Sequence, residues 1–288
     1  MKNVFINCNN INAFKNFIKT YSDDNKKYHY IIGRQNIGIL NREGLLTDTD
    51  ENVENILLSN GIKSYEFLHA TTIDNVVPNN WKTKSYELLK NMLVQYLAPW
   101  YIFKFTNYKN VLFIEEDFVL TKNLDFLSND CMALYSSLSL GNVPYCSDKA
   151  VELLKIQNVE NTLNNYVKYL YNRKIVGCPR YYTDIVEIQQ YEKYITDFYN
   201  NVNLYKIMSK SKVWHKGYMD EFFHSCSPIL FKDMGKYCKW ILIGERTIDK
   251  QNYRKLYDYS KTNILHIAGT SKNIVLNKIL EAGNGKIQ

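Results

Sequence analysis

The segment 111–120, VLFIEEDFVL, joins a short apolar run directly to three consecutive carboxylates. The four apolar residues 111–114 indicate a strand buried on both faces, and such strands belong to parallel sheets covered by helices. In these sheets ligands bind beyond the carboxyl ends of the strands. Glu115 and Asp117 would project to the same face of an extended chain, with Glu116 on the opposite face, and could hold one hard divalent cation. The segment therefore predicts an α/β fold with a metal-diphosphate site at a strand end.

The rest of the first half alternates between strand and helix patterns. Strands are predicted at 3–8, 28–33, 64–69 and 132–135, and helices at 13–21 and 85–105, with Pro99 expected to bend or break the second helix. This order favours a Rossmann-like, mostly parallel central sheet flanked by helices.

The second half is less regular. It contains predicted helices at 148–156, 161–171 and 191–202 and predicted strands at 182–188, 240–243 and 263–267. Because no linker or internal repeat marks a boundary, we expect a single domain spanning residues 1–288. Its nucleotide-binding half would cover about 1–135 and its second half about 136–288.

Composition narrows the class of partner. The chain has 288 residues, 45% of them hydrophobic and 23% charged, which is typical of a soluble globular protein. A net charge of +7 favours anionic partners, but the basic residues are scattered, so we expect no nucleic acid and leave peripheral membrane contact and oligomeric state open. Six widely spaced cysteines, no leader pattern and no membrane-length apolar run predict a cytoplasmic protein with free thiols.

A second informative segment, ILHIAGTSK at 264–272, places His266, Gly269 and Lys272 three residues apart at the end of a strand. A neutral imidazole can complete a metal site begun by carboxylates. Glycine lets backbone N–H groups approach a phosphate, and lysine supplies a positive charge for the same oxygens. A histidine at a strand end can also be purely structural, so this pattern gains its meaning from the carboxylates at 115–117.

Together the two segments resemble the family 8 nucleotide-sugar glycosyltransferases, the glycogenin and lipopolysaccharide galactosyltransferase group, which have the GT-A fold. Residues 111–117 are similar to that family's strand with the DxD metal motif, and 266–272 to its HxxGxxK segment. The resemblance implies Glu115, Asp117 and His266 as ligands of Mn²⁺ or Mg²⁺, and Gly269 and Lys272 as phosphate contacts. Glu115 replaces the first aspartate of the motif, and the Pro-Trp that follows the family's lysine is Asn-Ile here.

The resemblance implies further site residues. Asn7, Cys8 and Asn9 end the first strand, where the family binds uracil and ribose, although a plain polar turn would look the same; Glu116 is also a nucleotide-binding candidate. The segment 217–223 is similar to the family motif beside the donor sugar. Asp220 and Glu221 would be catalytic there, orienting the sugar or attacking it, unless Asp220 only caps a helix.

The resemblance therefore implies a metal-dependent, retaining glycosyltransferase that moves a hexose from a UDP-sugar to a glycan or protein acceptor, with the donor sugar and the acceptor bound by the half at about 136–288. Two alternatives remain. One is a non-catalytic protein that binds a sugar nucleotide or glycan on the same fold. The other is a sugar nucleotidyltransferase, although the residues after the first strand, 9–12, lack the glycine-rich basic loop typical of that class.

Overall fold

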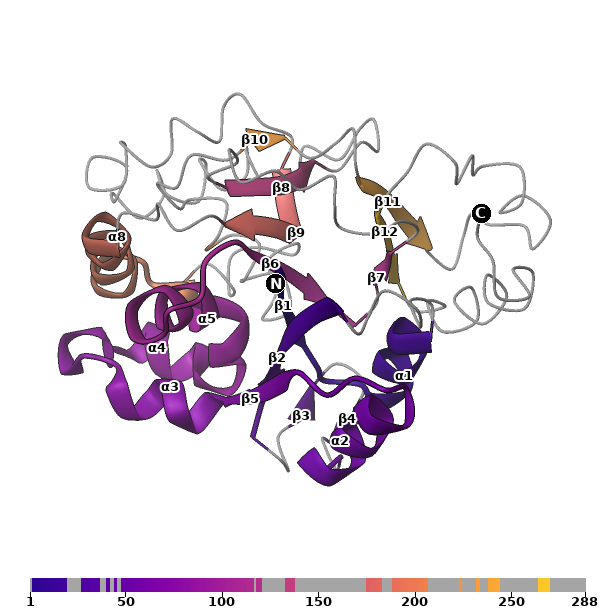
Figure 1. Ribbon diagram of the computed structural model, residues 1–288. Coiled ribbons are helices and arrows are strands. Elements are labelled where there is room, and N and C mark those ends of the chain that lie inside the picture. The colour runs from indigo at the N-terminus through magenta and orange to yellow at the C-terminus, as the bar shows by residue number, and fades with distance from the viewer. Residues whose placement is uncertain are drawn as a thin grey trace.

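The computed structural model describes residues 2–19, 27–36, 40–41, 44–45, 48–116, 118–120, 133–137, 175–182, 188–206, 223, 232–233, 238–243 and 264–269. A seven-stranded sheet, in the order β10-β8-β9-β6-β1-β2-β5, forms its centre (Figure 1). The strands are β1 (Lys2–Asn7), β2 (Tyr28–Arg34), β5 (Tyr65–His69), β6 (Val111–Glu115), β8 (Ala133–Ser137), β9 (Ile175–Tyr182) and β10 (Lys232–Asp233). Within this sheet β9 runs antiparallel to both neighbours, and the other neighbouring pairs are parallel. The predicted α/β class with a mostly parallel sheet is confirmed.

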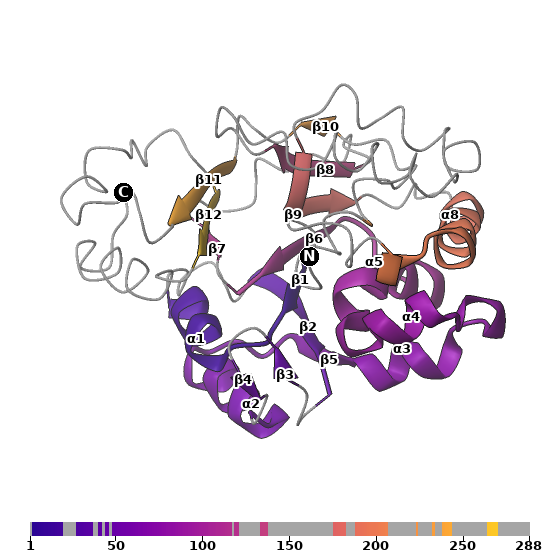
Figure 2. The same ribbon diagram turned by 180° about the vertical axis from the view of Figure 1, so that it is seen from behind.

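Helices cover both faces of the sheet (Figures 1 and 2). On one face lie α1 (Ile11–Lys19) and α2 (Asp50–Ser59), and on the other α3 (Ala70–Val76), α4 (Lys84–Leu89), α5 (Leu93–Phe105) and α8 (Ile188–Asn201). The strands are apolar on both sides, since Phe5 and Phe113 pack toward α3–α5 and α8, whereas Val4 and Leu112 pack toward α1 and α2. This double burial explains why their sequences are continuous apolar runs rather than alternating ones.

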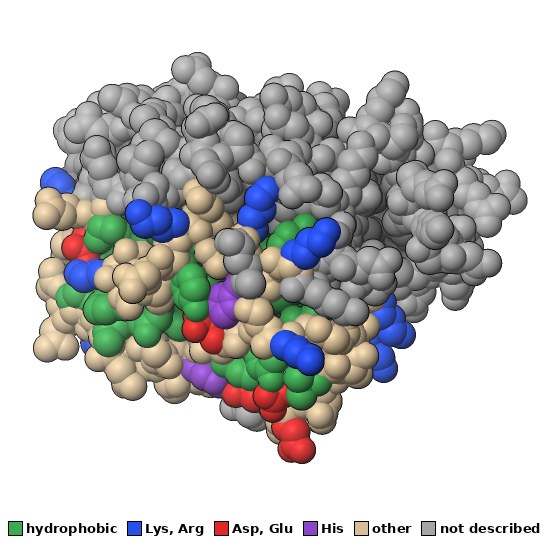
Figure 3. Space-filling model, in the orientation of Figure 1, with side chains coloured by type: hydrophobic (Ala, Val, Ile, Leu, Met, Phe, Trp, Pro, Cys, Tyr) green, Lys and Arg blue, Asp and Glu red, His purple; other side chains and the backbone are tan. Residues whose placement is uncertain are grey.

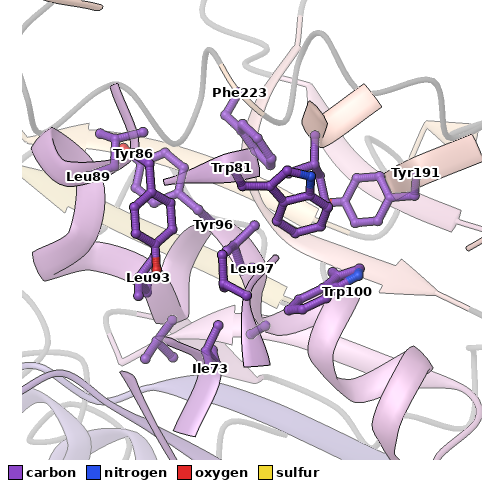
Figure 4. Close-up of a cluster of buried hydrophobic side chains, with 14 of the residues drawn as sticks. Ile73, Trp81, Tyr86, Leu89, Leu93, Tyr96, Leu97, Trp100, Tyr191 and Phe223 are labelled. Carbon is purple, nitrogen blue, oxygen red and sulfur yellow. The ribbon is translucent and has the colours of Figure 1, made fainter. Parts of the chain in front are cut away.

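The larger core is aromatic (Figure 4). Its fully buried side chains include Trp81, Trp100, Tyr86, Tyr96, Tyr191, Tyr194 and Tyr199. Trp81 lies in the short 3-10 helix η2 (Asn79–Trp81), and its ring centroid is 4.9 Å from that of Trp100 in α5. Many of the chain's 24 tyrosines thus serve the interior rather than a ligand surface.

Glycine is required where α5 meets the sheet. A Cβ atom added to Gly33 in β2 would lie 2.5 Å from both Phe5 Cζ and Val94 Cγ1. Any larger residue would have to push the strand and the helix apart, so Gly33 sets their close packing.

A second, three-stranded sheet has the order β11-β12-β7. It contains β7 (Phe118–Leu120), β11 (Cys238–Ile243) and β12 (Ile264–Gly269), with β11 and β12 parallel and β12 and β7 antiparallel. A short hairpin, β3 (Leu40–Asn41) and β4 (Gly44–Leu45), stands apart. Because β6 and β7 belong to different sheets, the chain leaves the first sheet after Glu115 and enters the second at Phe118.

Several predicted elements differ in detail from the structure. The helix predicted at 85–105 is interrupted by the 3-10 helix η3 (Lys90–Met92), while α5 continues through Pro99. The strand predicted at 182–188 shares only Tyr182 with β9, and Ile188 already begins α8. The helices predicted at 148–156 and 161–171 lie outside the described residues.

Candidate active site

The order of the parallel strands identifies one edge of the sheet as the place for a ligand. From β1 the chain moves outward through β2 to β5, and then returns to place β6 on the other side of β1. The strand order therefore reverses between β1 and β6, and ligands of open α/β sheets bind at the carboxyl ends of the strands at such a switch point. Asn7 and Glu115, the last residues of β1 and β6, are direct partners across it.

Two buried amides at this edge have no hydrogen-bond partner among the residues that the structure describes. Asn7 is 2% exposed and Gln35, the residue after β2, is 7% exposed. Neither side chain has a hydrogen bond within the described part of the chain. An unsatisfied buried polar group costs about 1–3 kcal/mol, so these amides fit a site completed by a polar ligand. Gln35 was not predicted from the sequence, and its place directly after a buried strand was the one available signal.

The carboxylates divide between the two faces of the sheet. Glu115 is half-buried, and alternation along β6 places it on the same face as Phe113 and Asn7. Glu116 is buried at 6% exposure, and its charge raises the pKa of the Cys8 thiol, so it lies on the other face near Cys8. Asp117 lies outside the described residues.

The second sheet carries His266 to the same segment. In the antiparallel pair of β12 and β7, the partner of His266 is Phe118, which follows Asp117 directly in the sequence. Gly269 is the last residue of β12 and is paired with Ile243 of β11. The backbone thus brings together the two segments that the sequence marked, although they are 149 residues apart (266 − 117).

Like Asp117, three further predicted site residues, Asp220, Glu221 and Lys272, lie outside the described residues. The nearest described neighbour of the first two is Phe223, which is buried in the aromatic core and whose carbonyl accepts a hydrogen bond from Tyr194 of α8. Phe223 itself is therefore linked to α8.

The predicted ligand set suits a hard cation by its chemistry, since carboxylate and imidazole groups both bind Mn²⁺. Among the side chains that the structure describes, no three His, Cys, Asp or Glu residues come together as a metal site. Of the predicted ligands, only Glu115 has a described side chain, so the metal set remains a prediction.

Cys8 is a buried core residue rather than an accessible ligand-binding group. Its side chain packs in the core beneath α1 and α2, and burial raises its pKa, with the negative charge of Glu116 acting in the same direction. The thiol therefore stays protonated and is a poor nucleophile. The following turn is polar for a local reason, because Asn10 Oδ1 accepts hydrogen bonds from the N–H groups of Asn12 and Ala13 at 3.0 Å each, which caps α1.

The described surface shows no concentration of positive charge on the face in Figure 3, where Lys and Arg side chains are separated and Asp and Glu gather toward the lower edge. Across the described residues, no helix has the length and apolarity needed to cross a membrane.

Comparison with known proteins gives neighbours only at the level of structure, because no family model and no curated protein matches the chain. The galactosyltransferase LgtC, in complex with donor and acceptor sugar analogs, is 10% identical, with 98% of this chain and 96% of that chain covered and a TM-score of 0.44. The glycosyltransferase GlyE of Streptococcus pneumoniae is 9% identical, covering 100% and 64%, with a TM-score of 0.47. Mouse xyloside xylosyltransferase 1 is 8% identical, covering 92% and 96%, with a TM-score of 0.41. All three of these structural neighbours are glycosyltransferases.

Proposed function

We propose that the protein is a retaining glycosyltransferase with the GT-A fold, which uses Mn²⁺ or Mg²⁺ and transfers a hexose from a UDP-sugar to a glycan or protein acceptor. The observation that carries the proposal is the meeting of three features at one edge. The switch point pairs Asn7 with Glu115, the carboxylate triplet follows at the passage between the sheets, and β12 places His266 opposite Phe118.

Asp117, Glu115 and His266 are the residues that would hold the cation. When bound, the ion would neutralise the charge that develops on the departing diphosphate. Glu115 reaches one methylene farther than aspartate, so it can bind the ion directly or through a water molecule.

The remaining site residues would each contact a different part of the sugar nucleotide. The unsatisfied amides of Asn7 and Gln35 would exchange hydrogen bonds with the base or ribose, with Asn9 beside them. Lys272 and the backbone of Gly269 would stabilise phosphate charge in the transition state. Asp220 would orient the sugar for front-face attack, or Asp220 or Glu221 would act as the nucleophile of a double displacement.

The proposal is tested by measuring UDP release from a panel of UDP-sugars with Mn²⁺. We expect the wild type to release UDP from at least one of them, and Asp117→Ala and His266→Ala to lower that rate on the order of 100-fold, since each removes a ligand of the charge-neutralising ion. His29→Gln, at the opposite edge of the sheet, is the matched control and should keep the rate. A wild type that releases no UDP and shows no metal-dependent UDP binding contradicts the proposal.

The glutamate at position 115 and the Asn-Ile after Lys272 support one alternative, a non-catalytic protein that binds a sugar nucleotide on the same fold. Such a protein would bind UDP weakly and without metal. Titration calorimetry with and without Mn²⁺ separates this alternative from the enzyme.

A further inference from the structure

Arg34, the last residue of β2, is a charged side chain buried to 4% exposure. Its Nε donates to Asp50 Oδ1 at 3.0 Å, and its two terminal nitrogens donate to the carbonyls of Cys8 at 3.1 Å and Asp48 at 2.6 Å. A buried charge is tolerated only when it is paired and hydrogen-bonded. This guanidinium meets that condition by joining β2 to two other segments of the chain, at Cys8 and at residues 48–50.

One of these segments carries the unsatisfied amide of the candidate site. Cys8 follows Asn7 directly, and its N–H donates to the carbonyl of Gly33 at 3.0 Å, while its own carbonyl accepts from Arg34. Both backbone polar groups of Cys8 are thus hydrogen-bonded to residues at the end of β2. Because Asn7 and Asn9 flank Cys8, the orientation of these two residues depends on those hydrogen bonds.

Asp50, the ion-pair partner of Arg34, also contacts a third strand, β5. Asp50 is the first residue of α2, and its Oδ2 also lies 3.0 Å from Nε2 of His69, the last residue of β5. A continuous chain of contacts, from the Cys8 carbonyl through Arg34 and Asp50 to His69, therefore ties the carboxyl ends of β1, β2 and β5 together.

We propose that Arg34 is a positioning residue of the nucleotide site: it holds the 7–9 segment in the shape that receives the nucleotide without touching the nucleotide itself. This inference rests on the proposed function. Arginine suits the role because its planar fork of donors reaches three acceptors in fixed directions, which the single ammonium of lysine cannot do.

The test is a double-mutant cycle on UDP affinity, measured by calorimetry with Mn²⁺. Arg34→Lys keeps the charge and should weaken UDP binding about tenfold, which corresponds to about 1.4 kcal/mol. In the Asn7→Ala background the same change should have little further effect, because Arg34 acts through the segment that carries Asn7.

The matched control is Asn3→Ala, which removes a buried side chain at the other end of β1, where Asn3 Nδ2 donates to the Lys109 carbonyl at 2.7 Å. It should lower the free energy of unfolding and leave UDP affinity unchanged. Asp50→Asn provides a second arm should Arg34→Lys not fold, since it removes only the charge of the carboxylate; it should weaken UDP binding and also be non-additive with Asn7→Ala.

The outcomes separate this inference from the function on which it rests. If the wild type binds no UDP, the proposed function fails and the inference fails with it. If the wild type binds UDP and folded Arg34→Lys binds equally well, or if its effect adds fully to that of Asn7→Ala, the role of Arg34 is only structural and the inference alone is overturned.

Discussion

At the scale of single residues, β1 contains two buried asparagines in contrasting environments. Asn3, at the start of the strand, donates to the Lys109 carbonyl, whereas the amide of Asn7, at its end, has no partner in the described part of the chain. The same type of side chain on the same strand thus makes a hydrogen bond within the fold at one edge of the sheet. At the other edge it leaves its hydrogen-bonding atoms without a partner among the described residues.

This contrast predicts different costs for the same substitution. Asn3→Ala should lower the free energy of unfolding by about 1–2 kcal/mol, because it removes a buried hydrogen bond and leaves a carbonyl unsatisfied. Asn7→Ala should cost less than about half of that, since it also removes an unsatisfied amide. Urea unfolding of the ligand-free protein measures both values. Equal losses would mean that Asn7 is a structural residue like Asn3.

The environment of His29 leads us to expect that the free energy of unfolding depends on pH. Its Nδ1 lies 3.0 Å from Ser64 Oγ and its Nε2 2.8 Å from Tyr108 Oη, and burial lowers its pKa, with Glu66 acting in the opposite direction. The unfolded chain therefore binds a proton more readily, so this contribution to stability is present above the ordinary pKa of 6.5 and decreases as pH falls below it.

The measurement is the free energy of unfolding between about pH 7 and pH 5. His29→Gln should make its decrease with acidification shallower than in the wild type. Asn3→Ala, at the same edge but without a titratable group, should lower the whole curve and keep its slope. An unchanged slope in His29→Gln would show that other groups cause the dependence.

The sequence predicted residue chemistry only where residue type and position were both unusual. Three carboxylates after an apolar run are rare enough to mark a site, and they led to Glu115 and His266. Arg34 and Gln35 gave no such signal, because both types are usually exposed and nothing in the sequence shows that they are buried. The role proposed for Arg34 depends on contacts with residues that are distant in the sequence, and the role proposed for Gln35 depends on a buried side chain without a hydrogen bond in the described part of the chain.

At the scale of elements, α8 is fixed to the first half of the chain through its last turn. Ser85 Oγ donates to the Val202 carbonyl at 2.6 Å, and Thr83 Oγ1 donates to the Tyr199 carbonyl at 2.9 Å. The final carbonyls of a helix lack partners within the helix, and here Ser85 of α4 and its N-cap residue Thr83 donate to carbonyls at and just after the end of α8. Tyr199 and Val202 also belong to the aromatic core, part of which is drawn in Figure 4.

Ser85→Ala should therefore destabilise the protein by about 1–2 kcal/mol, because it leaves a buried carbonyl unsatisfied. It should also speed amide hydrogen exchange in the last turn of α8 more than elsewhere. Ser59→Ala is a suitable control, since the Ser59 hydroxyl bonds a carbonyl at an exposed position and its loss should stay within about 0.5 kcal/mol. Equal effects of the two substitutions would contradict the buried contact.

The elements that were predicted well are those with a strong apolar pattern. β1, β2 and β6 each contain a short continuous apolar run, and their order together with β5 indicated a parallel sheet. By contrast, α2 was not predicted because it buries only Val53 and Leu57, too few for a clear helical period. β9 was not predicted because it contains Gly177 and Pro179, two residue types that are uncommon inside strands. Its pairing with β8 is also irregular, between Tyr135 and Ser137.

At the scale of the whole molecule, the central feature is the meeting of two sheets. The switch-point edge of the seven-stranded sheet ends at Asn7 and Glu115, and the three-stranded sheet begins at Phe118 with His266 opposite. The sequence motifs predicted that these segments act together, but the existence of a second sheet could not be predicted, since it depends on pairing between residues far apart in the chain.

Titration calorimetry of UDP with Mn²⁺ and after metal removal by EDTA tests this account most directly. We expect measurable UDP binding with Mn²⁺, a loss of about tenfold or more in affinity without it, and a similar loss in His266→Ala, because metal and diphosphate would share one site at the meeting of the sheets. Binding that is unaffected by EDTA and by His266→Ala, or no binding at all, would contradict the account.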